Sequence, residues 1–230
     1  MATNSGKRAR REKAEPTNIY RSNVAFKEVR PINYIQETYL QAIKDNDITF
    51  GIGSAGTGKT YVAGFYAASE LFHKRVDSII LTRPNVETGR SLGFLPGTLE
   101  EKNAPYLQPF DDVFKKALGP GFYEYALKSK TINPQPLGFM RGMTFENCIV
   151  LIDEAQQMTK TEFQMVLSRI GRNCKMILSG DPMQSDIHDS GLLDAVNRLR
   201  HIQGIEVVEF LDSDIVRSKM CKEIIIAYRQ

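Results

Sequence analysis

One octet of the sequence carries the residue types and spacing that bind phosphate. It reads Gly53-Ser54-Ala55-Gly56-Thr57-Gly58-Lys59-Thr60 and has the P-loop form G-x-x-x-x-G-K-T. Its glycines let backbone N–H groups turn toward an anion, and a helix that follows adds the positive end of its dipole. Lys59 would bridge the β- and γ-phosphates, and the Thr60 hydroxyl would be a ligand of Mg²⁺. A loop that only closes a turn is the alternative, and the full octet between an apolar run and a helix-like stretch disfavours it.

Two later apolar runs end in polar residues that suit the same chemistry. Asp153 and Glu154 follow one run, in the form of a Walker B element. Asp153 would hold Mg²⁺ through water beside Thr60, and Glu154 would orient and polarise the attacking water as a general base. The two acids could instead cap the next helix, but the P-loop upstream favours the catalytic role. Gln184 follows the second run, where its amide could bond the γ-phosphate or the attacking water.

Apolar runs of strand length lie ahead of these residues and must position them. We predict an α/β fold whose core is a predominantly parallel, five-stranded sheet, with ligands at the carboxyl ends of its strands. The expected strands are Ile48–Ile52, Ser78–Thr82, Cys148–Asp153, Met176–Ser179 and Ile205–Phe210. A helix is expected at about residues 31–43, where apolar residues recur at steps of three and four. Further helices are expected at about residues 61–72, 106–118 and 214–228.

Two more polar residues have positions that suit a nucleotide site. Gln36 lies on the first expected helix, ahead of the P-loop, and its amide could both donate to and accept from an adenine edge. Arg83 directly follows the second expected strand, so it would stand at the ligand-binding edge of the sheet. A structural ion pair is an equally good interpretation of Arg83.

Composition and charge limit the partners and the cellular location that we expect for this protein. Basic residues give the first thirteen positions a net charge of +4, so the total of +3 leaves −1 for the rest of the chain. Bulk charge therefore does not mark the folded part as a nucleic-acid binder. Residues 1–18 are predicted to be a disordered basic arm, and residues 19–230 a single domain with an insertion at about 85–147. No apolar run is long enough to span a membrane, and the three cysteines form no C-x-x-C pair. We expect no membrane partner and a cytoplasmic, reduced location.

Over about residues 31–228 the chain resembles the PhoH-like ATPases, which are close to the first RecA-like domain of superfamily-one helicases. The segments that carry the resemblance are G-x-A-G-T-G-K-T-Y ending at Tyr61, T-R-P-x-V from Thr82, L-G-F-L-P-G from Leu92, E-K-x-x-P-Y around Lys102, M-R-G-x-T-F from Met140, D-E-A-Q from Asp153 and S-G-D-P-x-Q from Ser179.

The resemblance implies a RecA-like, three-layer α/β/α fold, ATP and Mg²⁺ as cofactors, a nucleotide contact that extends to Tyr61, and a link to RNA or another single-stranded nucleic acid. The cations that these segments place near the sheet edge or in the insertion are Arg83, Arg90, Lys102 and Arg141. One departure is that Ser218, rather than histidine, follows Arg217, although the arginine itself is kept.

The resemblance also predicts an assembly. Related helicases place ATP between two RecA-like domains, and the second domain supplies an arginine to the γ-phosphate, but this chain has length for only one such domain. Arg217, expected at the start of the terminal helix, would therefore act on a neighbouring subunit's ATP. Head-to-tail contacts that close form rings, so we expect a homo-oligomer, most simply a hexamer.

Three other functions compete with an ATPase that acts on nucleic acid. A nucleotide-gated RNA-binding switch without helicase work would use the same residues. A thymidine-kinase-type phosphotransferase also pairs a P-loop with D-E-A-Q, but such kinases carry a zinc-binding C-x-x-C lasso that this sequence lacks. A GTPase is disfavoured because the guanine-reading motif N-K-x-D does not occur.

Overall fold

A computed structural model describes residues 26–84 and 99–228, and these residues form a six-stranded parallel sheet. The strand order is β3-β2-β4-β5-β1-β6. All five neighbouring pairs are parallel, so their carboxyl ends meet at one edge. The strands are β1 (Ile48–Gly53), β2 (Ser78–Thr82), β3 (Ile132–Pro134), β4 (Cys148–Ile152), β5 (Cys174–Gly180) and β6 (Ile205–Phe210).

The five expected strands all form, but the prediction of five was wrong because β3 adds a sixth. This strand has only three residues and contains Pro134, which cannot donate a backbone hydrogen bond. It pairs only with β2 among the described strands, and an edge position tolerates proline. A run this short and proline-containing gives no periodic signal in the sequence.

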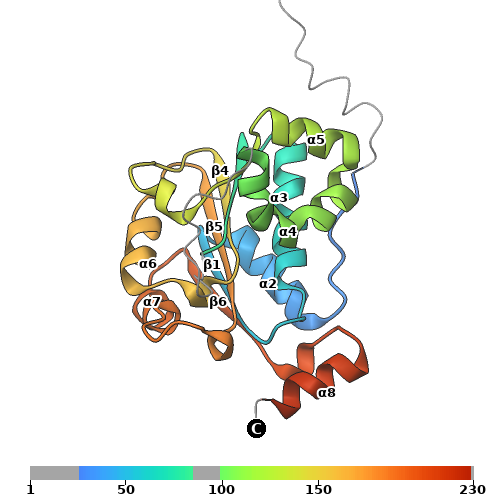
Figure 1. Cartoon of the computed structure of the whole chain (residues 1–230), viewed down its shortest axis with the longest axis vertical. Coiled ribbons are helices and arrows are strands. Elements are labelled where there is room, and N and C mark those ends of the chain that lie inside the picture. Colours follow the sequence, from blue (N-terminus) through green and yellow to red (C-terminus); the bar gives the residue numbers. More distant parts are fainter. Residues whose placement is uncertain (1–25, 85–98, 229–230) are drawn as a thin grey trace, which may run out of the picture.

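Helices cover both faces of the sheet, which confirms the predicted three-layer, RecA-like architecture (Figure 1). One face packs against α2 (Tyr34–Asp45), α3 (Lys59–Phe72), α4 (Leu99–Leu118) and α5 (Pro120–Lys128), and the other against α6 (Lys160–Leu167) and α7 (Leu192–Leu199). Alternate residues of a strand serve the two layers: Ile149 and Leu151 belong to the first cluster, and Val150 and Ile152 to the second. A strand buried on both faces must be apolar throughout, as β4 is.

The described part of the segment between β2 and β4 is built around α4, which packs against α3. The two helices approach so closely that a Cβ at Gly64 would lie 2.8 Å from Val113. Helix α5, strand β3 and the 3₁₀ helix η1 (Leu137–Met140) complete the segment. Residues 85–98 of the expected insertion and the expected arm at 1–18 lie outside the described residues.

The end of the chain differs from the expected continuous helix. It forms a 3₁₀ turn, η4 (Asp212–Asp214), and then a separate helix, α8 (Lys219–Ala227). The Ser218 side chain caps α8 by accepting a hydrogen bond from the backbone N–H of Cys221. Arg217 therefore lies in the connection before the helix, not in its first turn. No helix in residues 26–84 and 99–228 is long and apolar enough to cross a membrane.

Candidate nucleotide-binding site

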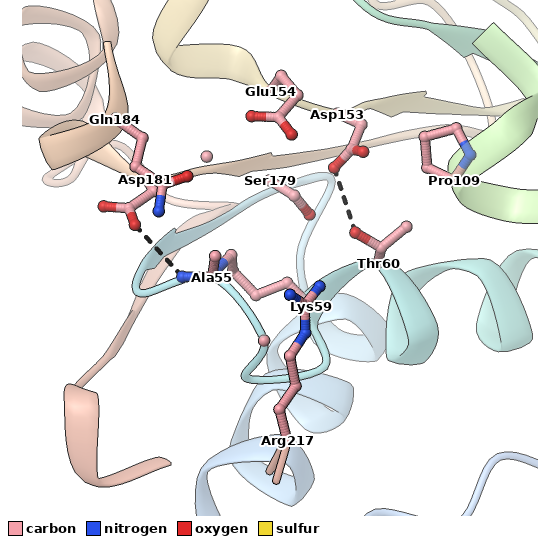
Figure 2. A pocket seen from close by; sticks show the side chains of 12 residues that line it. Ala55, Lys59, Thr60, Pro109, Asp153, Glu154, Ser179, Asp181, Gln184 and Arg217 are labelled. Atoms are coloured by element: carbon pink, nitrogen blue, oxygen red, sulfur yellow. Dashed lines mark hydrogen bonds between the residues drawn. The ribbon is translucent and has the colours of Figure 1, made fainter. Parts of the chain in front are cut away.

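The P-loop connects the end of β1 to the start of α3, at the carboxyl edge of the sheet (Figure 2). Gly53 needs to be glycine for two reasons: its φ is +122°, and a Cβ there would lie 1.9 Å from the Phe210 carbonyl oxygen on β6. Gly58, the residue before α3, has a φ of +91°. These two residues turn the chain sharply, so that the N-terminus of α3 faces a pocket of about 300 Å³.

Lys59 is buried under the loop that it follows, and its ammonium group lines the pocket. Its Nζ donates to the carbonyl oxygens of Gly53 at 2.8 Å and Ser54 at 2.7 Å, and to Thr57 Oγ1 at 3.3 Å. The backbone thus holds this charge where the phosphates of a bound nucleotide would lie.

Thr60 and Asp153 come together across the sheet edge. The Thr60 hydroxyl donates to Asp153 Oδ1 at 3.2 Å (Figure 2). Burial, and next the charge of Glu154, raise the pKa of Asp153 from 3.8 to about 6, although Arg83 and the Thr60 hydrogen bond oppose the change. A hydroxyl and a carboxylate at the mouth of a P-loop are the oxygen donors that Mg²⁺ prefers, so the residues present fit this ion. No cluster of three or more His, Cys, Asp or Glu that could hold a metal without other ligands occurs within the described ranges.

Glu154 is fixed by two neighbours. Its carboxylate accepts from Arg83 Nη2 at 3.1 Å and from Gln156 Nε2 at 2.6 Å. Its own backbone is left-handed, with a φ of +53°, which is uncommon for a residue with a side chain. Such backbone conformations cluster at functional sites. Arg83 thus forms an ion pair, which was one of the two interpretations of this residue from the sequence. The ion pair lies at the ligand-binding edge of the sheet.

Two acids that sequence reasoning did not assign hold the P-loop from the side. Asp181 Oδ2 accepts from the backbone N–H of Ala55 at 3.2 Å, and Asp212 accepts a hydrogen bond from the Ser54 hydroxyl. Asp181 lies in the S-G-D-P-x-Q segment, which was identified from the sequence as a family-like motif. Its contact with Ala55 was not predicted. Asp212 has no motif around it, and only the fold brings it to the loop.

Gln36 supports the P-loop from beneath and does not line the pocket. Its Nε2 donates to the Thr57 carbonyl oxygen at 2.9 Å, and its Oε1 accepts from the Ile32 N–H at 3.1 Å. The side chain is 2% exposed, and a Cβ at Gly58 would lie 2.5 Å from Nε2. A contact with adenine would require the amide to leave both of its partners.

Arg217 lines the pocket of its own chain, and the expectation that it acts on a neighbouring subunit's ATP stays a prediction. The connection before α8 folds back over the P-loop, where the Val216 N–H donates to the Gly56 carbonyl oxygen at 3.0 Å. The arginine stem then lies so close that a Cβ on Gly56 would be 2.9 Å from its Cδ. Figure 2 shows the Arg217 side chain extending toward the P-loop, and both Arg217 and Lys59 line the pocket.

The remaining predicted residues lie in different places. Gln184 lines the pocket from η3 (Pro182–Gln184), with its backbone carbonyl oxygen held by Gln157 Nε2 at 3.1 Å. Tyr61 does not line the pocket and packs against Phe65, with ring centroids 4.6 Å apart. Pro109 of α4, which was not predicted, does line it.

Of the four cations expected to contact nucleic acid, the structure describes the side chains of two. Arg83 lies at the sheet edge beside Glu154, and Arg141 is exposed at the end of η1. Arg90 and the side chain of Lys102 lie outside the described residues.

The parallel sheet, the P-loop after β1 and the acids after β4 define a P-loop nucleotide-binding protein of RecA-like fold. Within that class, the sequence profile described as PhoH-like protein matches residues 28–229, and the chain belongs to this family.

Similar proteins agree with this assignment. The "PhoH-like protein" of Bacillus subtilis (strain 168) is 43% identical over 209 residues, which cover 90% of this chain and 66% of that protein. "Protein PhoH" of Escherichia coli (strain K12) is 41% identical over 201 residues, covering 85% of this chain and 57% of that protein. The chain thus spans about 57–66% of the length of these two relatives. Among solved structures, the large terminase of a thermophilic bacteriophage shares the fold at a TM-score of 0.51 and 13% identity, over 85% of this chain and 50% of that one.

Proposed function

We propose that this protein hydrolyses ATP with Mg²⁺. The observation that carries the proposal is the approach of the Thr60 hydroxyl to Asp153, 3.2 Å apart, beside Lys59 at the mouth of the P-loop. Binding alone needs only the loop and the lysine. A carboxylate at this point adds a place for a divalent cation, and Glu154 adds a base beside it.

The residues of the pocket divide the work of hydrolysis. The P-loop N–H groups, Lys59 and Arg217 would hold the phosphates and oppose the negative charge that builds up on the γ-phosphoryl group. Glu154 would accept a proton from a water molecule. The water oxygen then bonds to the γ-phosphorus while the bond from that phosphorus to the bridging oxygen breaks, giving ADP and phosphate. Mg²⁺, held by Thr60 and Asp153, would neutralise phosphate charge.

Two substitutions test these roles separately. Lys59→Ala removes the charge that holds the phosphates, so both nucleotide affinity and turnover should fall. Glu154→Gln keeps size and hydrogen bonding but loses basicity, so ATP should still bind while kcat drops by ~10²-fold or more. Glu146→Gln is the matched control, because it makes the same change at an exposed acid outside the pocket.

The result for Glu154→Gln decides between hydrolysis and its competitors. Normal turnover in this variant would refute the assigned role of the base. ATP binding without turnover in the wild type, with or without RNA, would indicate a nucleotide-gated switch. Phosphate transfer to an added nucleoside would indicate a kinase.

We further propose that hydrolysis is coupled to RNA or another single-stranded nucleic acid. The proposal is supported by Arg83, which stands at the sheet edge in contact with Glu154, and by the exposed position of Arg141. Binding to a phosphate backbone should weaken as salt rises. Charge reversal at the four cations named from the sequence should lower RNA affinity. Unchanged RNA affinity would refute the role of these cations, but it would not refute the proposed ATP hydrolysis.

A homo-oligomer, with the hexameric ring as its expected form, and a cytoplasmic location both stay predictions. The argument that a neighbouring subunit must supply Arg217 is weaker, because this arginine also lines its own chain's pocket. Sedimentation at the concentration used for activity assays tests the assembly directly.

A further inference from the structure

A chain of hydrogen bonds runs from the P-loop to the far side of Glu154. The Ala55 N–H donates to the Asp181 carboxylate at 3.2 Å, and the Asp181 N–H donates to Gln156 Oε1 at 3.0 Å. Gln156 Nε2 donates to Glu154 Oε2 at 2.6 Å, and Arg83 Nη2 donates to Glu154 Oε1 at 3.1 Å. Four consecutive bonds therefore connect the phosphate-binding loop, two strand ends and a half-buried arginine.

Gln156 is the link in this chain whose orientation is fixed by chemistry. A backbone N–H can only donate, so the amide oxygen of Gln156 must face Asp181, and its NH₂ group must then face Glu154. The side chain cannot easily turn away. It is 1% exposed, and it lies so close to Gly180 that a Cβ there would be 3.0 Å from Oε1.

Glu154, in contrast, has few other contacts within the part of the chain that the structure describes. It stands at the end of β4 on a left-handed backbone, with a side chain that is 35% exposed, so rotation into solvent is open to it. Each carboxylate oxygen has two acceptor sites, and the bonds from Gln156 and Arg83 use one on each oxygen. The second site on each oxygen is left for water. A base held in this way accepts a proton along a fixed direction.

We propose that Gln156 is a positioning residue that orients Glu154 for attack, with Arg83 as its second support. Because Gln156 also bonds to Asp181, which bonds to Ala55, the position of the P-loop and the orientation of the base are set together. This inference rests on the proposed function, since it needs Glu154 to act as the base. Hydrolysis loses rate when a base is displaced by about 1 Å, while nucleotide binding does not depend on its orientation.

Gln156→Glu is the sharpest test. The new side chain keeps an oxygen for the Asp181 N–H, but it places a second carboxylate oxygen where the donor to Glu154 stood. We expect kcat to fall ~10–100-fold, with the KM and Kd for ATP changed less than ~3-fold. Gln157→Glu is the matched control: it alters the adjacent buried glutamine, whose side chain bonds to Gln184 and Asp186 and not to the Glu154 carboxylate.

Combination with Glu154→Gln separates orientation from general damage to the fold. In a protein that already lacks the base, Gln156→Glu should cause no further loss of kcat, because a positioning residue has nothing left to position. Arg83→Lys should keep more of the wild-type kcat than Arg83→Met, since lysine can still donate to Glu154 Oε1. ATP affinity measured by a fluorescent analogue reports whether each variant is folded.

The outcomes distinguish this inference from the proposed function. If Glu154→Gln turns over normally, the proposed function fails. If Glu154→Gln is inactive but Gln156→Glu has the same kcat as Gln157→Glu, only the role of Gln156 is overturned. The role of Gln156 is equally overturned if Gln156→Glu raises the KM at unchanged kcat. It is also overturned if the double variant loses kcat by the product of the two single losses.

Discussion

Replacing Asp153 by asparagine should stabilise the metal-free protein while abolishing the proposed hydrolysis of ATP. The side chain is 8% exposed, and burial together with the neighbouring Glu154 raises its pKa from 3.8 to about 6. An acid whose pKa is higher in the folded protein than in the unfolded chain opposes folding whenever it is ionised. The asparagine side chain would carry no charge and could still accept the hydrogen bond from Thr60.

The magnitude follows from the two pKa values. A pKa near 6 in the folded state against 3.8 in the unfolded state corresponds to about 3 kcal/mol of lost stability at neutral pH, at about 1.4 kcal/mol for each pH unit. The two added amide hydrogens of asparagine need partners, which reduces the gain. We therefore expect Asp153→Asn to raise the free energy of unfolding by about 1–3 kcal/mol at about pH 7.5.

The sign of the pH dependence provides a second check. Between about pH 4 and pH 6 the folded protein binds more protons at Asp153 than the unfolded chain does, so wild-type stability falls as pH rises through this window. An asparagine at position 153 does not titrate in this window. Its advantage should therefore shrink to about half at about pH 5 and vanish near pH 4. Urea unfolding in the presence of a chelator, at about pH 7.5 and at about pH 4, measures the difference.

Asp181→Asn is the control within the same pocket. Both carboxylate oxygens of Asp181 accept backbone N–H bonds, from Ala55 and Met183, and an amide can replace only one of these acceptors. This variant should lose stability where Asp153→Asn gains it. The reasoning is refuted if Asp153→Asn is no more stable than the wild type at neutral pH. It is also refuted if the gain in free energy of unfolding is the same at about pH 4 as at about pH 7.5.

Three further predictions concern the support of the loop and the pocket. Gln36→Ala should raise the KM for ATP and for GTP by similar factors, measured by steady-state hydrolysis, because this side chain holds the P-loop; a loss confined to ATP would indicate contact with adenine. Mixtures of Lys59→Ala and Arg217→Ala subunits should recover no activity, because both residues serve the same chain's pocket, and recovery would show that the arginine acts between subunits. Gly51→Ala should lower the free energy of unfolding by about 1–3 kcal/mol in urea titrations, because a Cβ would lie 2.8 Å from the Tyr39 ring, and an unchanged midpoint would show that the ring yields freely.

The sequence alone determined the parts of this protein that depend on local patterns. A strand buried on both faces must be apolar along most of its length, so β1, β2, β4 and β5 could be located from single apolar runs. The edge strand β6 is half exposed and was located from a run that also contains two glutamates. The P-loop could be assigned because its chemistry requires glycines and a lysine at fixed spacing. Parallel strands then place their carboxyl ends together, which predicted that Asp153 would meet Thr60.

Only the tertiary structure decided how residues distant in sequence share hydrogen bonds. Gln36 has two polar groups that suit either adenine or a backbone carbonyl, and the packing of α2 beneath the P-loop gives it to Thr57. Arg217 lies 161 positions after Gly56 in the sequence, and the turn before α8 brings it over that glycine in the same chain. Side chains such as these carry no periodic or motif signal of their partners, because hydrogen bonds depend on the direction and distance between groups that the fold alone sets.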